Sequence, residues 1–117
     1  LYVAMENAIV QLPDREGAWF DFACVLVEGS TGKRTQTFSA MVQFPTADCD
    51  QGLSAGTFQT ATVGSAVAAR LQSEAGEGVT VDGQDPHAAL TAGSVIREEI
   101  LRDAVKICLG QLASGVE

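Results

Sequence analysis

The residues best suited to chemistry in this chain are its single histidine and its three cysteines. His87 follows Asp85 and Pro86, so a carboxylate lies two positions from the imidazole. Histidine works as a general acid or base only when the fold brings a nucleophile or a second acid beside it, and no spacing here selects such a group. We therefore expect His87 at the surface, in the first turn of a helix that starts at Asp85-Pro86, and we predict no catalytic residue.

The three cysteines, Cys24, Cys49 and Cys108, are widely separated in the sequence. Zinc sites usually place two ligands within a few residues of each other, which these cysteines do not. Cys49 stands between Asp48 and Asp50, and both carboxylates oppose the formation of a reactive thiolate. An odd number of cysteines without a secretory signal is typical of a reducing compartment. We predict no metal site, no cofactor and a cytoplasmic location.

Two further motifs resemble ligand sites only in part. Residues 29–33 end like a phosphate-binding loop, but Arg34 stands where Ser or Thr is needed and a strand follows instead of a helix. We expect a hairpin turn there. The acidic clusters at residues 48–50 and 82–85 lack the twelve-residue spacing of a calcium loop, so we expect solvated turns and helix caps.

The charge of the chain limits its partners. Seven basic and fifteen acidic residues give a formal net charge of −8. Such a charge disfavours binding to the anionic backbone of nucleic acid and favours basic protein partners. No apolar run approaches the roughly 20 residues that span a bilayer. We therefore expect no direct contact with nucleic acid and none with a membrane.

Apolar periodicity and turn residues give a coarse secondary structure. The predicted elements, in chain order, are strands at residues 2–12, 19–28 and 34–44, a loop at 46–56, a short strand at 57–62, and helices at 65–75 and 95–112. Short connections between the strands favour an antiparallel meander. We predict a single α+β domain over residues 1–117, with an antiparallel sheet of three to five strands and two main helices packed on one face.

The strand at residues 19–28 is apolar on both faces. Its aromatic face carries Phe20, Phe22 and Leu26. With Phe38 and Phe44 from the next strand, we expect this face to form the core beneath the helices. A monomer rarely leaves a second apolar face to water, so either another part of this chain covers it or it is an interface. The predicted interface residues are Trp19, Ala23, Val25, Val27 and Met41.

Surplus apolar strand surface and acidic charge, without a catalytic group of residues, favour a small non-enzymatic protein that acts by protein–protein association. We expect a homodimer, or binding to a basic protein. An accessory or regulatory protein of the type encoded by phages or mobile elements would fit this description. The alternative is a small-molecule-binding protein or enzyme with a pocket near the 46–56 loop and His87, with Asp85 or Cys49 beside it.

Overall fold

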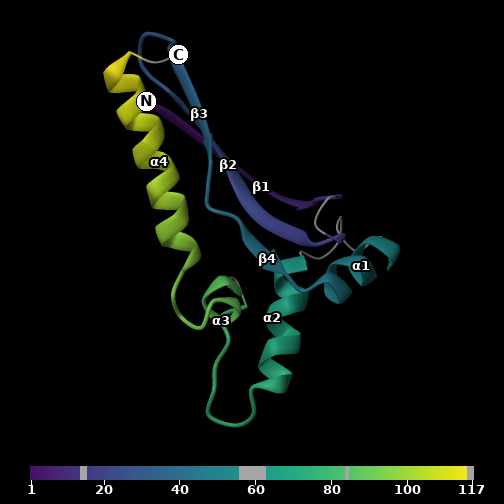
Figure 1. The fold of residues 1–117 in the computed structure, drawn as a ribbon. Coiled ribbons are helices and arrows are strands. Elements are labelled where there is room, and N and C mark those ends of the chain that lie inside the picture. Colours follow the sequence, from purple (N-terminus) through teal and green to yellow (C-terminus); the bar gives the residue numbers. More distant parts are fainter. Residues whose placement is uncertain (14–15, 56–62, 84, 116–117) are drawn as a thin grey trace. The chain divides into compact units, whose positions relative to one another are not determined.

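The computed structural model describes residues 1–13, 16–55, 63–83 and 85–115 of the chain (Figure 1). Strands come first and helices follow, which confirms the predicted α+β class. The strands are β1 (Tyr2–Gln11), β2 (Trp19–Glu28), β3 (Arg34–Phe38) and β4 (Val42–Phe44). The helices are α1 (Thr46–Ala55), α2 (Val63–Glu74), α3 (His87–Leu90) and α4 (Arg97–Ser114).

The strands form one antiparallel sheet with β2 at its centre. β1 and β3 lie on either side of β2, and β4 also pairs with β2. β2 and β3 run antiparallel, with Cys24 opposite Phe38. The connection between them closes through the Gly29 N–H, which donates to the Lys33 carbonyl at 2.8 Å. Gly32 has a φ of +80°, a left-handed conformation that favours glycine, so this segment forms the predicted hairpin turn.

The predicted third strand, residues 34–44, is interrupted in the structure. β3 ends at Phe38 and β4 begins at Val42. Between them, the Ser39 N–H donates to the Ala23 carbonyl at 2.8 Å, and Ser39 Oγ accepts the Ala23 N–H at 2.8 Å. The hydroxyl takes the place of a backbone acceptor, so the regular ladder stops where this side chain enters it.

Helix α1 occupies residues 46–55, so the prediction of a loop at residues 46–56 was wrong over these ten residues. Pro45 precedes the first turn, where a fixed φ suits a helix start, and Asp48 brings negative charge to the helix N-terminus. These two signals outweigh Gly52, which favoured a loop in the sequence. The predicted strand at residues 57–62 lies outside the described residues.

The predicted helices at residues 65–75 and 95–112 correspond to α2 and α4, with ends that differ by no more than two residues. α3 is a single turn, because the chain takes left-handed conformations at Ala92 and Gly93, with φ values of +51° and +79°. None of the described helices combines the length and the apolar character that a bilayer crossing requires.

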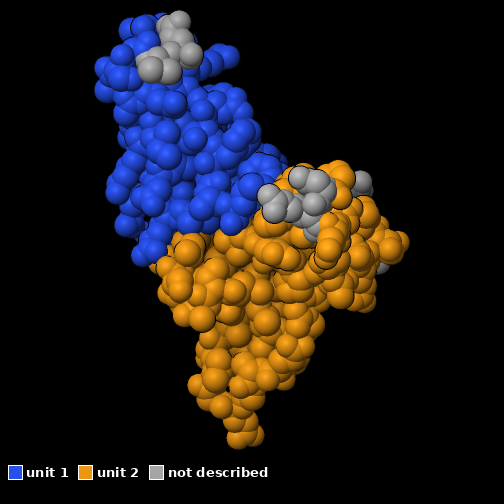
Figure 2. All heavy atoms as spheres, viewed as in Figure 1, with its two compact units in different colours: residues 1–9, 21–41, 98–117 blue, residues 10–20, 42–97 orange. Residues whose placement is uncertain are grey.

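The chain separates into two compact units (Figure 2). Unit 1 comprises residues 1–9, 21–41 and 98–117, and unit 2 comprises residues 10–20 and 42–97. Both β1 and β2 contribute residues to each unit. A single domain over the whole chain therefore stays a prediction.

In unit 1, α4 runs along one face of the sheet (Figure 1). Val25 and Val27 of β2 pack with Ala104 and Cys108 of α4, and all four side chains are buried. Two polar contacts fix the helix in place. Cys108 Sγ donates to the Val25 carbonyl at 3.6 Å, and Thr35 Oγ1 donates to the Cys108 carbonyl at 2.9 Å.

Unit 2 combines apolar burial with polar contacts between its elements. Trp19 Nε1 donates to Asp50 Oδ1 at 2.8 Å, which ties the start of β2 to α1. The rings of Phe44 and His87 meet at a steep angle, with centroids 5.7 Å apart, and so join β4 to α3. The buried apolar side chains of this unit are Trp19, Val42, Phe44, Cys49, Val63, Val67 and Ala68.

Candidate functional site

Most of the residues predicted to form an interface lie inside the chain. The buried ones are Trp19, Ala23, Val25 and Val27. Met41, immediately before β4, is 47% exposed. The prediction that the helices cover the aromatic face of β2 is therefore wrong, because α4 covers the opposite face.

The small side chains of α4 explain which face it covers. Ala104 and Cys108 are four residues apart on the buried stripe of the helix, and they let it approach the β-branched Val25 and Val27 closely. Phenylalanine rings on the other face would hold the same stripe away from the sheet. Periodicity located this stripe in the sequence but did not identify the sheet face that it fits.

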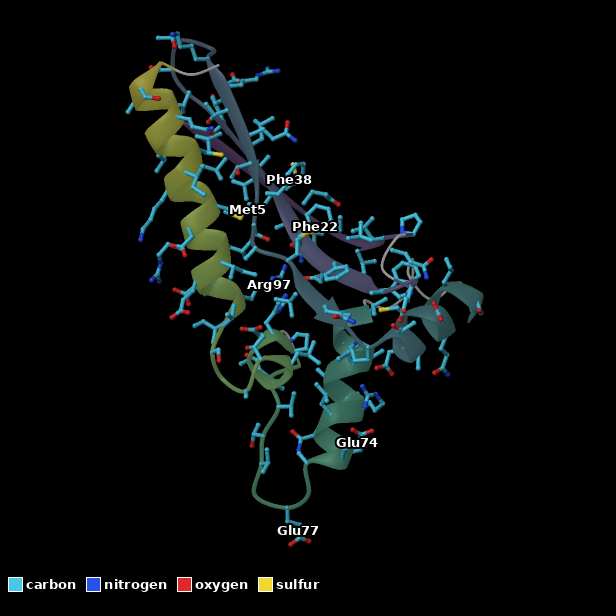
Figure 3. All side chains as sticks on the ribbon, viewed as in Figure 1. Met5, Phe22, Phe38, Glu74, Glu77 and Arg97 are labelled. Atoms are coloured by element: carbon cyan, nitrogen blue, oxygen red, sulfur yellow. The ribbon has the colours of Figure 1, made fainter. Side chains whose placement is uncertain are left out.

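The other face of β2 and β3 in unit 1 is the strongest candidate site, and we call it the open face. Phe38 is 58% exposed there, and its ring meets that of Phe22 at 77° with centroids 5.5 Å apart (Figure 3). Such an edge-to-face pair presents a large apolar surface. The open face consists of alternate side chains on the two strands: Phe22, Cys24, Leu26, Glu28, Arg34, Gln36 and Phe38.

The polar members of the open face are paired with one another. The Gln36 side-chain amide donates to Cys24 Sγ at 3.0 Å. Arg34 donates from Nε to a carboxylate oxygen of Glu28, directly across the two strands. The open face thus holds one acidic and one basic residue, and its formal charge is zero in a chain of −8.

Strand β1 adds an exposed edge to unit 1. Among the described strands it pairs only with β2, so its outer edge carries backbone groups that no other described strand meets. Residues 2–7 are all exposed, on both faces of the strand. Several of the exposed side chains on β1, and that of the residue before it, are large and apolar: Leu1, Tyr2, Val3 and Met5.

Asp85 and His87 of unit 2 form a pair that holds the starts of two helices in place. His87 starts α3, as predicted, but its side chain is buried rather than at the surface, with 3% of the residue exposed. Its Nδ1 lies 2.9 Å from Asp85 Oδ1, which also accepts the His87 N–H at 3.1 Å. Asp85 Oδ2 accepts the Arg97 N–H at 2.9 Å. One carboxylate therefore fixes the start of α3 and the first residue of α4.

A second charged cluster, not singled out in the sequence, joins α1 to α2. Arg70 Nε donates to both carboxylate oxygens of Asp48, at 3.0 and 2.9 Å, and Arg70 also pairs with Glu74 at 2.8 Å. The hydrogen bonds, first that to Asp48 and then that to Glu74, raise the pKa of the Arg70 guanidinium above its usual value. This cluster positions two helices and points to no ligand.

The cysteines lie apart from these charged groups. All three are thiols, and Cys49 and Cys108 are fully buried, whereas Cys24 is half-buried on the open face. Within the described ranges, no three His, Cys, Asp or Glu side chains come close enough to hold a metal ion.

Comparison with known proteins adds no function. A scan against protein-family models gave no match, and searches of curated proteins and of solved structures gave none either. The geometry of the chain is therefore the basis for choosing between the open face and the His87 region.

Proposed function

We propose that this is a small acidic, non-enzymatic protein of the cytoplasm that acts by protein–protein association through the open face of unit 1. One observation carries the proposal: β2 is apolar on both faces, and α4 covers only one of them. The other face carries the exposed Phe38 against the half-buried Phe22, and aromatic residues are typical of the centre of a protein interface. Two kinds of partner fit, a second copy in a homodimer and a basic protein.

The alternative, a ligand pocket beside His87, has weaker support. His87 and Cys49 are both buried, and the Nδ1 of His87 is engaged by Asp85. Residues 46–55, expected to be a loop at the mouth of the pocket, form helix α1. These groups hold unit 2 together, which accounts for their positions without a substrate.

The test compares two equally exposed apolar residues. Phe38 on the open face is 58% exposed, and Leu53 on α1 is 57% exposed. Light scattering on a size-exclusion column should show self-association of the wild type over a range of about 10–200 µM. Phe38→Asp should abolish it, because a charge replaces the projecting ring, whereas Leu53→Asp should not. Circular dichroism should show the same fold for all three proteins.

A monomeric wild type would not end the proposal by itself, because a different protein could occupy the face. Affinity capture with the same three baits then decides. A protein retained by wild type and Leu53→Asp but lost from Phe38→Asp would support association through the open face. A monomeric wild type whose captured proteins are the same for all three baits would refute it.

A further inference from the structure

We infer that the partner on the open face is a second copy of this chain, packed open face to open face about a two-fold axis. This inference rests on the proposed function and narrows its partner to one. In a two-fold contact the same surface is used on both sides, so that surface must be compatible with itself in charge and in shape.

Charge is the first argument for a second copy. Two chains of formal charge −8 repel each other over most of their surfaces. The open face is an exception, since its only charged residues, Glu28 and Arg34, neutralise each other across the strands. A strongly basic partner would instead be drawn to the acidic surfaces elsewhere on the chain. On these two strands, a copy of the chain therefore meets no unpaired like charge.

Shape is the second argument. The cross-strand pair at the middle of the face sets the large, exposed Phe38 beside the smaller, half-buried Cys24. Sheets that pack face to face lie about 10 Å apart, with side chains from both sheets filling the space between them. A two-fold axis that passes near this pair would bring the projecting Phe38 of each copy over the lower Cys24 of the other copy. We infer such an axis, because it matches large side chains with small ones.

A charge exchange at Gln36 tests the inference. Gln36 is exposed on β3, one position along the same face from Phe38, and pairs in register with Leu26. Gln36→Glu or Gln36→Lys would place like charges on both copies of a homodimer. Each variant alone should weaken self-association by about tenfold or more at low ionic strength. An equimolar mixture of the two should recover the wild-type dissociation constant to within about threefold, because opposite charges then face each other.

A matched control is available on another exposed glutamine. Gln51 lies on α1 in unit 2, and Gln51→Glu and Gln51→Lys change the net charge by the same amounts. These variants should leave self-association within about twofold of the wild type. Analytical ultracentrifugation of the separate and mixed proteins measures all of these constants.

Cys24 gives a second measurement that needs no charge. It is the one described cysteine that is not fully buried, and it lies on the open face. A short bis-maleimide cross-linker should join two wild-type chains through Cys24, and Cys24→Ser should abolish the product. If copies met along β1 instead, Val3→Cys in the Cys24→Ser background would cross-link.

The outcomes separate this inference from the proposed function. Recovery of the dimer by the Gln36 mixture, with Cys24 cross-links, supports the second copy on the open face. A dimer that is insensitive to both Gln36 variants, or that cross-links only through Val3→Cys, overturns it. A monomeric wild type also overturns the inference. The proposed function still stands in that case if a captured protein is lost on Phe38→Asp.

Discussion

The two faces of β2 have similar apolar composition, but helix α4 covers only one of them. Val25 and Val27 are completely buried beneath α4, whereas their neighbours Cys24 and Leu26 lie on the open face. The two faces differ in the residues that lie opposite them. Small residues of α4 pack on the valines, and the β3 residues on the valine face are threonines, whereas those on the open face include Arg34 and Gln36. The apolar content of a strand therefore predicts how much of its surface must be buried. The elements that pack against the strand determine which of its faces is buried within the same chain.

A charge placed on each face in turn should give the largest contrast. Val25→Asp buries an unpaired carboxylate under α4 and should destabilise the fold by about 3–5 kcal/mol. Leu26→Asp, one residue along the strand, places the carboxylate on the open face and should lower the free energy of unfolding by no more than about 1.5 kcal/mol. Urea unfolding followed by circular dichroism measures both. Equal losses in the two variants would break the distinction between the faces.

A smaller contrast lies on β3. Thr35 is buried and its hydroxyl donates to the Cys108 carbonyl, so Thr35→Val should cost about 1 kcal/mol. Gln36 is exposed on the open face and its amide donates to the Cys24 thiol, a weak acceptor, so Gln36→Ala should cost a few tenths of a kcal/mol at most. Both values come from the same unfolding measurement. A loss in Gln36→Ala that matched that in Thr35→Val would show that the open face is as tightly organised as the covered one.

Unit 2 offers a similarly small effect, at the polar contact between its helices α1 and α2. Arg70 is 36% exposed, so solvent screens its pair with Asp48, and Arg70→Gln should cost no more than about 1 kcal/mol. The pKa of the guanidinium is raised in the folded chain, so its stabilisation is fully present below the pKa of the unfolded chain. It is lost only as pH rises through the higher pKa of the folded chain.

The loss on Arg70→Gln should therefore be the same at about pH 7 and about pH 9, since both values lie well below the pKa of arginine. Thermal unfolding of wild type and variant at the two values checks this. A difference between wild type and variant that shrinks markedly at the higher pH would contradict the assignment.

The sequence was sufficient to predict the α+β class, the positions of β2, α2 and α4, and the hairpin turn at residues 29–33. These features depend on local periodicity and on glycine, which act within a few residues. Helix α1 depends on Pro45 and Asp48, and the break after β3 depends on the Ser39 hydroxyl. The effects of these residues compete with neighbouring signals. Such competition is not resolved by pattern alone.

The aromatic face of β2 was predicted to be the core, but the structure buries the valine face, for a physical reason. The aromatic residues of β2 were expected to be core because they are large. The register shows that this face also carries Glu28, Arg34 and Gln36, whereas the valine face pairs with Thr35 and Thr37. The distribution of charge across the paired strands, available once the hairpin is recognised, was the signal that could have reversed the choice.

The contact between Val25 and Cys108 joins residues 83 positions apart, and this separation bears on how the chain acquires its structure. Contacts of such long range form late, because a large loop must close before they contribute. During synthesis, β2 is complete long before α4 leaves the ribosome. In that interval both faces of β2 lack the cover of α4. We therefore expect the nascent chain to be most prone to aggregation before α4 is synthesised and packs on the sheet.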